Sequence, residues 1–385
     1  MKICAIICEY NPFHNGHQYH IEQAKALSNA DYIVCIMSGN FVQRGEAAIM
    51  EKHLRAKHAL LNSADAVIEL PVHFSTANAE LFAKGAVKLV NAIPNVTHLC
   101  FGTECGNAEE FISAAKILNN EPIEVSKKIK ELSQSGFSYA KARHEAFSPY
   151  INSKLMLSPN NLLGIEYTRA ILASNSNVQI LPIQRIGANY SEVEVKENYS
   201  SASAMRKAVL ENQHAALQAN LPHAVYNDLS KTNNITLTSL ERYAVLSTPK
   251  EELANTLDCT EGLENAFAQA AINEKDFEIA LTNARYTSSR IRRIALQNLL
   301  KIRENDIRNA LKASLFLRVL AVRNTEILSI IGKSDYPLIV KNGDGKKLDG
   351  IAKKVFSTNE FADQIYAIAC NKQYQSQTPF FNKYE

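Results

Sequence analysis

The chain has 385 residues, of which 46% are hydrophobic and 21% are charged, as in a globular protein of about two domains. Its formal net charge of +3 is too small to make the whole surface attractive to nucleic acid, so any basic surface must be local. The seven cysteines form no Cys-x-x-Cys pair, which indicates buried thiols in a reducing compartment rather than a disulfide framework. No apolar run approaches the ~18 residues that span a membrane, so we expect a cytoplasmic protein.

Short apolar runs alternate with helical patterns through about the first 190 residues. The runs are brief and continuously apolar, which is typical of strands that are covered on both faces. They lie at residues 2–8, 32–37, 66–70, 98–101 and 178–183. Helices are expected between them at residues 15–27, 47–61, 79–90 and 108–118, and at 159–172 behind a Ser158 cap. This alternation predicts an α/β fold with a Rossmann-like, doubly wound parallel sheet.

The second half of the chain has a different pattern. From residue 206 to about residue 331, nearly every segment has helical periodicity. We therefore expect two domains, an α/β domain over residues 1–205 and a mainly helical domain over residues 206–385. The basic, turn-rich segment 341–347 is expected to form a hairpin or loop, and it lacks the spacing of a phosphate-binding P-loop.

The strongest chemical signal is Glu-Tyr-Asn-Pro-Phe-His-Asn-Gly-His at residues 9–17, between the first expected strand and the first expected helix. Ligands of open α/β sheets bind at the carboxyl ends of strands, and backbone N–H groups at a helix start attract phosphate. Gly16 has no side chain, so a phosphate can approach the backbone closely. His14 and His17 are three residues apart, so one helical turn can present both imidazoles to charge that develops on an α-phosphate.

Two other interpretations of these histidines stay open from the residues alone. They could be surface residues without a function, or they could be a metal-binding pair. A zinc site would need further ligands, and no His/Cys cluster in the sequence supplies them at a familiar spacing. The sequence therefore assigns no metal ligands.

Two further pairs of residues are candidates for binding a phosphate or another substrate group. Gln43 and Arg44 follow the second expected strand, on the sheet edge that His14 occupies. Ser203 and Arg206 lie three residues apart, where Ser203 could cap a helix and Arg206 could reach phosphates. Either pair could instead be structural, as a turn with an exposed charge in the first case and as a helix cap with a solvated arginine in the second.

A local concentration of basic residues lies in the helical half. Residues 285–323 contain ten Lys or Arg and only two acids, whereas an ordinary solvated helix face mixes both signs. We predict that Arg285, Arg290, Arg292 and Arg293 contact the phosphate backbone of a nucleic acid. The alternative is an exposed amphipathic helix without a ligand.

Motifs along the chain resemble one known family. His-x-Gly-His after a first strand is similar to the signature of the nucleotidyltransferase superfamily and of class I aminoacyl-tRNA synthetases. The whole run at residues 9–17 more specifically resembles the bacterial tRNA(Met) cytidine acetate ligases. The same resemblance is carried by Met-Ser-Gly-Asn-Phe-Val-Gln-Arg-Gly-Glu at 37–46, Ile-Glu-Leu-Pro at 68–71, Phe-Gly-Thr-Glu at 101–104, Pro-Asn-Asn-Leu-Leu-Gly at 159–164 and Ser-Ala-Ser-Ala-Met-Arg at 201–206.

This resemblance implies a reaction and its partners. Members of that family activate acetate with ATP to give acetyl-adenylate and pyrophosphate, and they transfer the acetyl group to N4 of the wobble cytidine of elongator tRNA(Met). We therefore expect ATP, Mg²⁺, acetate and tRNA to bind, and we expect neither a membrane nor a protein partner. Glu9 and Glu104, near strand ends, could position magnesium or the ribose.

The resemblance also implies site residues. The catalytic residues would be His14 and His17. The ATP site would consist of Ile7, Cys8, Glu9, Tyr10, Asn11, Pro12, Phe13, His14, Asn15, Gly16, His17, Gln18, Tyr19, His20, Gly102, Asn160 and Arg185.

Two alternative functions are weighed against the ligase. A plain adenylyltransferase would move AMP onto a small phosphate ester, but such an enzyme needs little more than the first domain. A non-catalytic RNA-binding protein could keep a vestigial nucleotide fold, but the intact His14, Gly16 and His17 argue against it.

Overall fold

The computed structural model describes residues 1–137, 139–186, 200–376 and 378–381. Its centre is a sheet of eight strands among these residues, in the order β10-β8-β5-β2-β1-β6-β7, with β9 beside β8. Three of these strands come from the second half of the chain, namely β8 (Leu317–Val322), β9 (Leu338–Ile339) and β10 (Phe380–Phe381). The strands expected from the sequence are β1 (Ile3–Cys8), β2 (Tyr32–Ser38), β5 (Ala66–Leu70), β6 (Val96–Thr103) and β7 (Gln179–Gln184). All pairings among these five are parallel, so the expected Rossmann-like α/β fold is confirmed.

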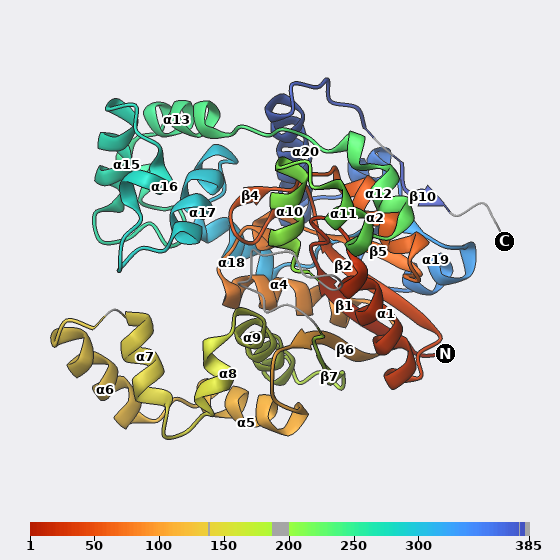
Figure 1. Ribbon diagram of the computed structural model, residues 1–385, viewed down its shortest axis with the longest axis horizontal. Coiled ribbons are helices and arrows are strands. Elements are labelled where there is room, and N and C mark those ends of the chain that lie inside the picture. Colours follow the sequence, from red (N-terminus) through yellow and green to blue (C-terminus); the bar gives the residue numbers. More distant parts are fainter. Residues whose placement is uncertain (138, 187–199, 377, 382–385) are drawn as a thin grey trace.

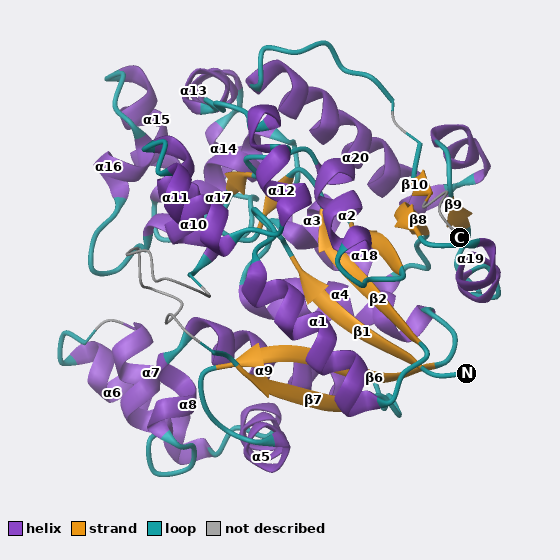
Figure 2. Ribbon diagram, turned by 45° about the vertical axis from the view of Figure 1, so that its right-hand side comes forward, coloured by secondary structure: helices purple, strands orange, loops and turns teal. Residues whose placement is uncertain are grey.

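Helices cover both faces of this sheet (Figure 2). Side chains alternate along a strand, so Cys4 and Ile6 of β1 pack into one layer, and Ile3 and Ala5 pack into the other. The first layer includes α1 (Asn15–Ser28), α2 (Lys52–Leu61), α10 (Ala202–Leu210), α11 (His214–Asn220) and α12 (His223–Asn227). The second includes α3 (Val72–Ser75), α4 (Ala79–Ala92), α5 (Ala108–Asn119), α9 (Pro159–Ala173), α18 (Glu304–Lys312) and α20 (Gly350–Ala369).

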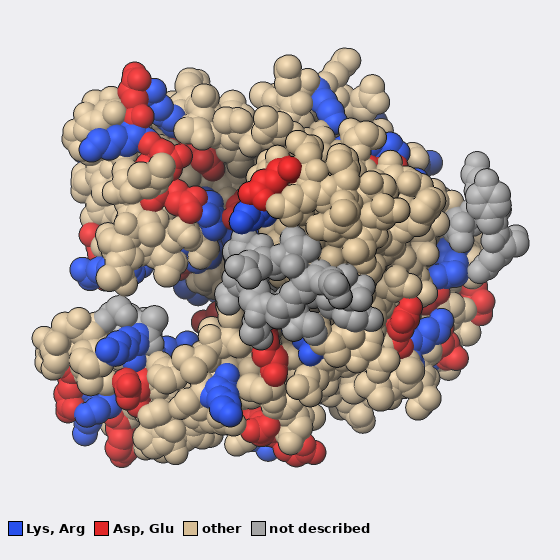
Figure 3. All heavy atoms as spheres, viewed as in Figure 1, with Lys and Arg blue, Asp and Glu red and all other residues tan. Residues whose placement is uncertain are grey.

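Two groups of helices project to the same side of the molecule (Figure 1, left). The first group, called here the helical lobe, consists of α13 (Thr238–Ser247), α14 (Lys250–Leu253), α15 (Leu263–Ile272), α16 (Phe277–Leu281) and α17 (Ser288–Leu299). It has an apolar core of its own, built around Phe267 and Ile294. The second group is α6 (Ile123–Gln134), α7 (Tyr139–Phe147) and α8 (Ser153–Leu157). A hollow separates the two groups on the face seen in Figure 3.

The expectation of helices from residue 206 to about residue 331 is wrong for one segment. Within the stretch expected to be helical, Leu317–Val322 forms strand β8, which pairs antiparallel with β5 in the central sheet. All six of its residues are buried, including Arg318, whose charge is balanced by acids that lie far away in the sequence. The strand therefore completes the sheet that the first domain begins, and the division of the chain at residue 205 stays a prediction.

Other bounds differ from the expected ones at identifiable residues. Helix α2 begins at Lys52 rather than near residue 47, because the Glu51 carboxylate caps it by accepting from the His53 backbone N–H at 2.8 Å. The segment expected as a loop at 341–347 contains a 3₁₀ helix, η2 (Asn342–Lys347). The remaining elements are β3 (Phe41–Val42), β4 (Glu46–Ala47), η1 (Leu229–Lys231) and α19 (Thr325–Ile331). None of the helices in the described part of the chain combines the length and the apolar composition needed to span a bilayer.

A network of buried ion pairs joins helix α20 to the sheet. Lys52 Nζ lies 2.7 Å from Glu69 of β5 and 2.5 Å from Asp363 of α20. Arg318 of β8 pairs with Glu69 at 3.2 Å and with Glu360 of α20 at 2.8 Å. Charges taken out of water are tolerated only with such close partners, so the network holds α20 against the sheet in one position.

We expect Lys52→Met to lower the free energy of unfolding by about 3–5 kcal/mol, because Glu69 and Asp363 stay buried and keep only Arg318 of the two cations they share. Lys84→Met is the matched control, since Lys84 forms an exposed i,i+4 pair with Glu80 and should cost about 0.5 kcal/mol or less. Urea denaturation of both variants measures the difference. Equal losses in the two variants would contradict a structural role for the network.

Candidate active site

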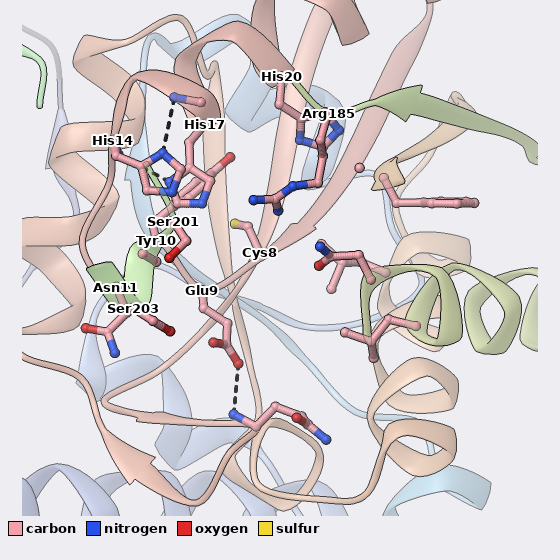
Figure 4. A pocket seen from close by; sticks show the side chains of 18 of the residues that line it. Cys8, Glu9, Tyr10, Asn11, His14, His17, His20, Arg185, Ser201 and Ser203 are labelled. Atoms are coloured by element: carbon pink, nitrogen blue, oxygen red, sulfur yellow. Dashed lines mark hydrogen bonds between the residues drawn. The ribbon is translucent and has the colours of Figure 1, made fainter. Parts of the chain in front are cut away.

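A pocket opens where β1, β6 and β7 end and where α1 begins (Figure 4). The hairpin of β3 and β4 and the start of α10 also contribute to it. Of the residues expected at a nucleotide or substrate site, it is lined by Ile7, Cys8, Glu9, Tyr10, Asn11, His14, Gly16, His17, Tyr19, His20, Gln43, Arg44, Gly102, Asn160, Arg185, Ser203 and Arg206. The fold thus brings together residues that lie up to about 200 positions apart, at the sheet edge where α/β proteins bind ligands.

The two histidines cap the first helix. His14 is the N-cap residue of α1, and its Nδ1 accepts the backbone N–H of Gly16 at 3.1 Å. In the reciprocal contact, Nδ1 of His17 accepts the backbone N–H of His14 at 3.2 Å. The two imidazole rings stack with their centroids 3.6 Å apart. This reciprocal cap fixes both rings at the helix start without any ligand.

Both rings are uncharged near neutral pH. Burial, followed by the positive charges of Arg185 and Arg206, lowers the pKa of His14 to about 3. Burial and then His14 itself hold the pKa of His17 well below its usual value. In each neutral ring Nδ1 is an acceptor, so the ring hydrogen is assigned to Nε2. The site therefore offers two N–H donors that carry no charge.

Gly16 is needed for the ring of His14 to fold over the helix start. A Cβ at position 16 would lie 3.0 Å from Cε1 and 3.1 Å from Nδ1 of His14. From the sequence, this glycine is expected to let a phosphate approach the backbone closely. The structure adds a second reason, because a methyl group there would crowd the imidazole and shift it by a few tenths of an ångström.

Arg185 and Asn160 line the opposite side of the pocket, beside the end of β6. The Arg185 backbone N–H donates to Thr103 O at 2.8 Å, and a Cβ on Gly102 would lie 3.3 Å from Arg185 Cγ. Asn160 Nδ2 donates to Glu104 Oε1 at 2.6 Å. Gly102 thus gives room to the arginine stem, and Glu104 holds the amide of Asn160 in place.

Arg206 reaches the pocket from α10. Its Nη1 donates to Asn11 O at 2.9 Å, and its Nη2 donates to Ser203 Oγ at 3.2 Å. The expected helix cap at Ser203 is wrong. Ser201 is the N-cap residue, and its hydroxyl accepts the Ala204 backbone N–H at 3.1 Å, which leaves Ser203 one turn before Arg206 to orient the guanidinium.

Glu9 lies at the floor of the pocket, next to the β3–β4 hairpin. Its Oε1 accepts the Gln43 backbone N–H at 2.8 Å (Figure 4). Burial raises the pKa of Glu9, while the contact with Gln43 and the charge of Arg206 oppose the rise. Among the described residues, no group of three or more His, Cys, Asp or Glu side chains could hold a metal ion.

The chain is similar to known proteins over almost its whole length. A family model described as HIGH Nucleotidyl Transferase matches residues 1–379. The chain is 42% identical over 313 residues to the tRNA(Met) cytidine acetate ligase of Clostridium novyi, with 77% of this chain and 78% of that protein covered. It is 37% identical over 386 residues to the tRNA(Met) cytidine acetate ligase of a Thermoanaerobacter species, with 96% of each covered. The chain belongs to the tRNA(Met) cytidine acetate ligase family.

Solved structures of a relative have the same fold. The crystal structure of Thermotoga maritima TmcAL in its apo form matches with a TM-score of 0.90, at 29% identity and 99% coverage of both chains. The structure of the same protein bound with alpha-thio ATP matches with a TM-score of 0.87, at the same identity and coverage. The family resemblance inferred from the motifs is thereby confirmed.

Four of the expected ATP-site residues do not line the pocket. Phe13 is fully buried in the apolar core, and Pro12 is buried before it. Asn15 Nδ2 donates to Ala219 O at 3.0 Å, and Gln18 donates to Glu22 at 3.1 Å. These residues shape or flank the helix start rather than face the pocket.

Sequence reasoning missed an apolar wall of the pocket. It includes Phe82 of α4, Phe101 of β6, and Leu163 and Tyr167 of α9. The rings of Phe101 and Tyr167 lie 5.8 Å apart. These residues sit on the apolar stripes of ordinary core elements, so no signal in the sequence separates a pocket wall from core packing.

The four arginines expected to bind nucleic acid occupy different surroundings. Arg285 is 65% exposed and pairs with Glu261 at 2.6 Å. Arg290 donates to Asp258 O at 2.7 Å and lies over the ring of Tyr286. Arg293 is buried against Asp258, and Arg292 faces Glu46 and Glu278. Contact with nucleic acid stays a prediction for all four.

We expect the imidazole of His14 to stay neutral from about pH 8 down to about pH 5, because its pKa lies at about 3 rather than near 6.5. Its Cε1–H resonance, assigned with a His14→Gln variant, should not move over this range. Between those two pKa values the unfolded chain binds more protons at this residue, so His14 should also lower the free energy of unfolding as the pH falls. A titration midpoint near pH 6.5 would refute the neutral pair.

Proposed function

We propose that this protein is an ATP-dependent ligase that activates acetate as acetyl-adenylate and transfers the acetyl group to N4 of the wobble cytidine of elongator tRNA(Met). The observation that carries the proposal is the stacked, neutral pair of His14 and His17 at a helix start, in a pocket that also holds Arg185 and Arg206. Two relatives named tRNA(Met) cytidine acetate ligase and a neighbour bound with alpha-thio ATP support the substrates.

In the first step, a carboxylate oxygen of acetate attacks the α-phosphorus of ATP. The new O–P bond forms as the bond to pyrophosphate breaks, and negative charge grows on the α-phosphate oxygens. The Nε2–H groups of His14 and His17 donate to these oxygens, as preorganised donors that need no change of protonation. The pyrophosphate leaves beside Arg206, whose guanidinium can donate to its oxygens in a forked geometry.

In the second step, the N4 amine of cytidine attacks the acyl carbon of the adenylate. The N–C bond forms, AMP leaves with its phosphate oxygen, and the amine loses a proton. We propose that Ile7–His20, Gly102, Asn160 and Arg185 bind the nucleotide, except for the side chains that face away from the pocket. Mg²⁺ would enter with ATP, held by phosphate oxygens and by water molecules that it retains, since the described residues present no dedicated acidic cluster.

We expect His17→Ala to reduce tRNA-independent, acetate-dependent ATP–pyrophosphate exchange by ~10²–10³, because a transition-state donor is lost. His14→Ala should also reduce exchange, but to a lesser degree. Gln18→Ala serves as the control, because its side chain pairs with Glu22 outside the pocket. Undiminished exchange in folded His14→Ala and His17→Ala would remove the catalytic assignment.

The tRNA surface is proposed to include the exposed end of the helical lobe. Arg285 and Arg290 both lie over the half-buried ring of Tyr286, with 5.8 Å and 5.0 Å to its centroid, so two cations and one aromatic ring lie together. Such a group can contact the phosphate backbone and an unpaired base.

We expect Arg285→Glu to weaken tRNA binding and to lower the slope of log affinity against log salt by roughly one, as for one lost phosphate contact. Lys84→Glu changes the net charge equally on a distant helix, so it should leave the slope near that of the wild type. Filter binding at several salt concentrations makes the comparison. An unchanged slope in Arg285→Glu would place the tRNA surface elsewhere.

A further inference from the structure

Helix α17 of the helical lobe contacts the rim of the active-site pocket through one arginine. Arg292 Nε donates to Arg44 O at 3.2 Å, and Arg292 Nη2 lies 3.0 Å from Glu46 Oε1. Its remaining nitrogen, Nη1, donates to Glu278 Oε1 of α16 at 2.7 Å. Only 23% of the side chain is exposed, and each of its three nitrogens contacts either the β3–β4 hairpin or α16 of the lobe.

The hairpin lies directly on the backbone of α17. Gly45 at its turn has φ +74°, and a Cβ there would lie 2.5 Å from Arg293 N and 2.6 Å from the carbonyl carbon of Arg292. Any side chain at this position would therefore push the hairpin off the helix. Gln297 adds a second anchor, because its amide donates to Thr76 O at 2.6 Å in a buried contact.

The other side of the same hairpin faces the nucleotide pocket. Gln43, Arg44 and Glu46 all line it, together with Arg206. The Gln43 backbone N–H is held by Glu9, and Glu46 Oε2 lies 3.9 Å from Arg206 Nη2. The hairpin from Phe41 to Ala47 thus contacts helix α17 and also lines the pocket.

Glu46 is shared between two arginines, and the sharing is unequal. One of its oxygens is in close contact with Arg292, whereas the other is at the limit of an ion pair with Arg206. Without Arg292, the Glu46 carboxylate would have Arg206 as its nearest cation and would pair with it more strongly. It would then compete with phosphate oxygens for the guanidinium that α10 presents to the pocket.

We propose that Arg292 is a positioning residue of the active site, which holds Glu46 and the β3–β4 hairpin against α17 and so keeps Arg206 available to the distal phosphates of the nucleotide. The contact between helix α17 and the β3–β4 hairpin thereby sets the affinity of the pocket for a triphosphate. This inference rests on the proposed function in one respect, namely that the pocket binds ATP. It gives Arg292 a role that needs no tRNA.

The test compares the affinities of folded variants for ATP and AMP by calorimetry, without tRNA and without turnover. Arg292→Ala should weaken ATP binding about tenfold and AMP binding less than about twofold, because AMP lacks the distal phosphates. Arg292→Lys keeps a cation near Glu46 and should recover part of the ATP affinity. Arg242→Ala is the matched control, since Arg242 also donates to one backbone carbonyl and one glutamate, but away from the pocket.

Gly45→Ala tests the same contact without removing a charge, and it should reproduce the ATP-specific loss. Gly262→Ala is its control, because Gly262 has a similar φ of +83° within the lobe but no atom within 4 Å of an added Cβ. A wild-type protein that fails to bind ATP would refute the proposed function itself. If the wild type binds ATP and either folded variant, Arg292→Ala or Gly45→Ala, binds it equally well, the inference is overturned. Loss of tRNA affinity alone in Arg292→Ala would also overturn it, and would return Arg292 to the nucleic-acid surface.

Discussion

The position of the active site depends on one buried guanidinium group. Arg55 of α2 is fully buried, and its nitrogens donate to the backbone carbonyls of Glu9, Ser38, Gly39 and Met50. Three of these carbonyls lie just at or beyond the ends of β1 and β2, where the sheet no longer supplies donors. A buried carbonyl left without a partner costs about 1–3 kcal/mol. One side chain therefore holds two strand ends together, and with them the loop that carries the two histidines.

Helix α2 extends this arrangement to the end of the chain. One turn before the arginine, Lys52 pairs with Glu69 of the sheet and with Asp363 of α20. Further along α20, the Tyr366 hydroxyl donates to Ala48 O at 2.8 Å, just after the β3–β4 hairpin. The last helix thus packs behind the hairpin while α17 packs against its turn. Segments more than 200 residues apart in sequence support the short hairpin that borders the pocket.

The pocket contains two kinds of hydrogen-bond donor, charged arginines and uncharged histidines. Fixed cations come from Arg185 and Arg206. Burial, followed by these two charges, keeps the imidazole of His14 neutral, and burial, followed by His14 and Arg185, keeps that of His17 neutral. Neutral donors can stabilise an anionic transition state without first binding the ground-state phosphates as strongly as a cation would. A carboxylate, Glu46, lies at the rim near one of the cations, and the helical lobe balances it with a second arginine.

The sequence by itself determined the five parallel strands, the helix start at Asn15 and the family, because these signals are local. A short apolar run that is bounded by turn residues indicates a buried strand, and His-x-Gly-His carries its geometry within one turn of helix. The tertiary structure alone decided that Leu317–Val322 is a strand and that Arg292 faces the pocket rim rather than solvent. Both depend on partners from distant segments. A charged residue has the same appearance in sequence whether water solvates its charge or a buried glutamate pairs with it.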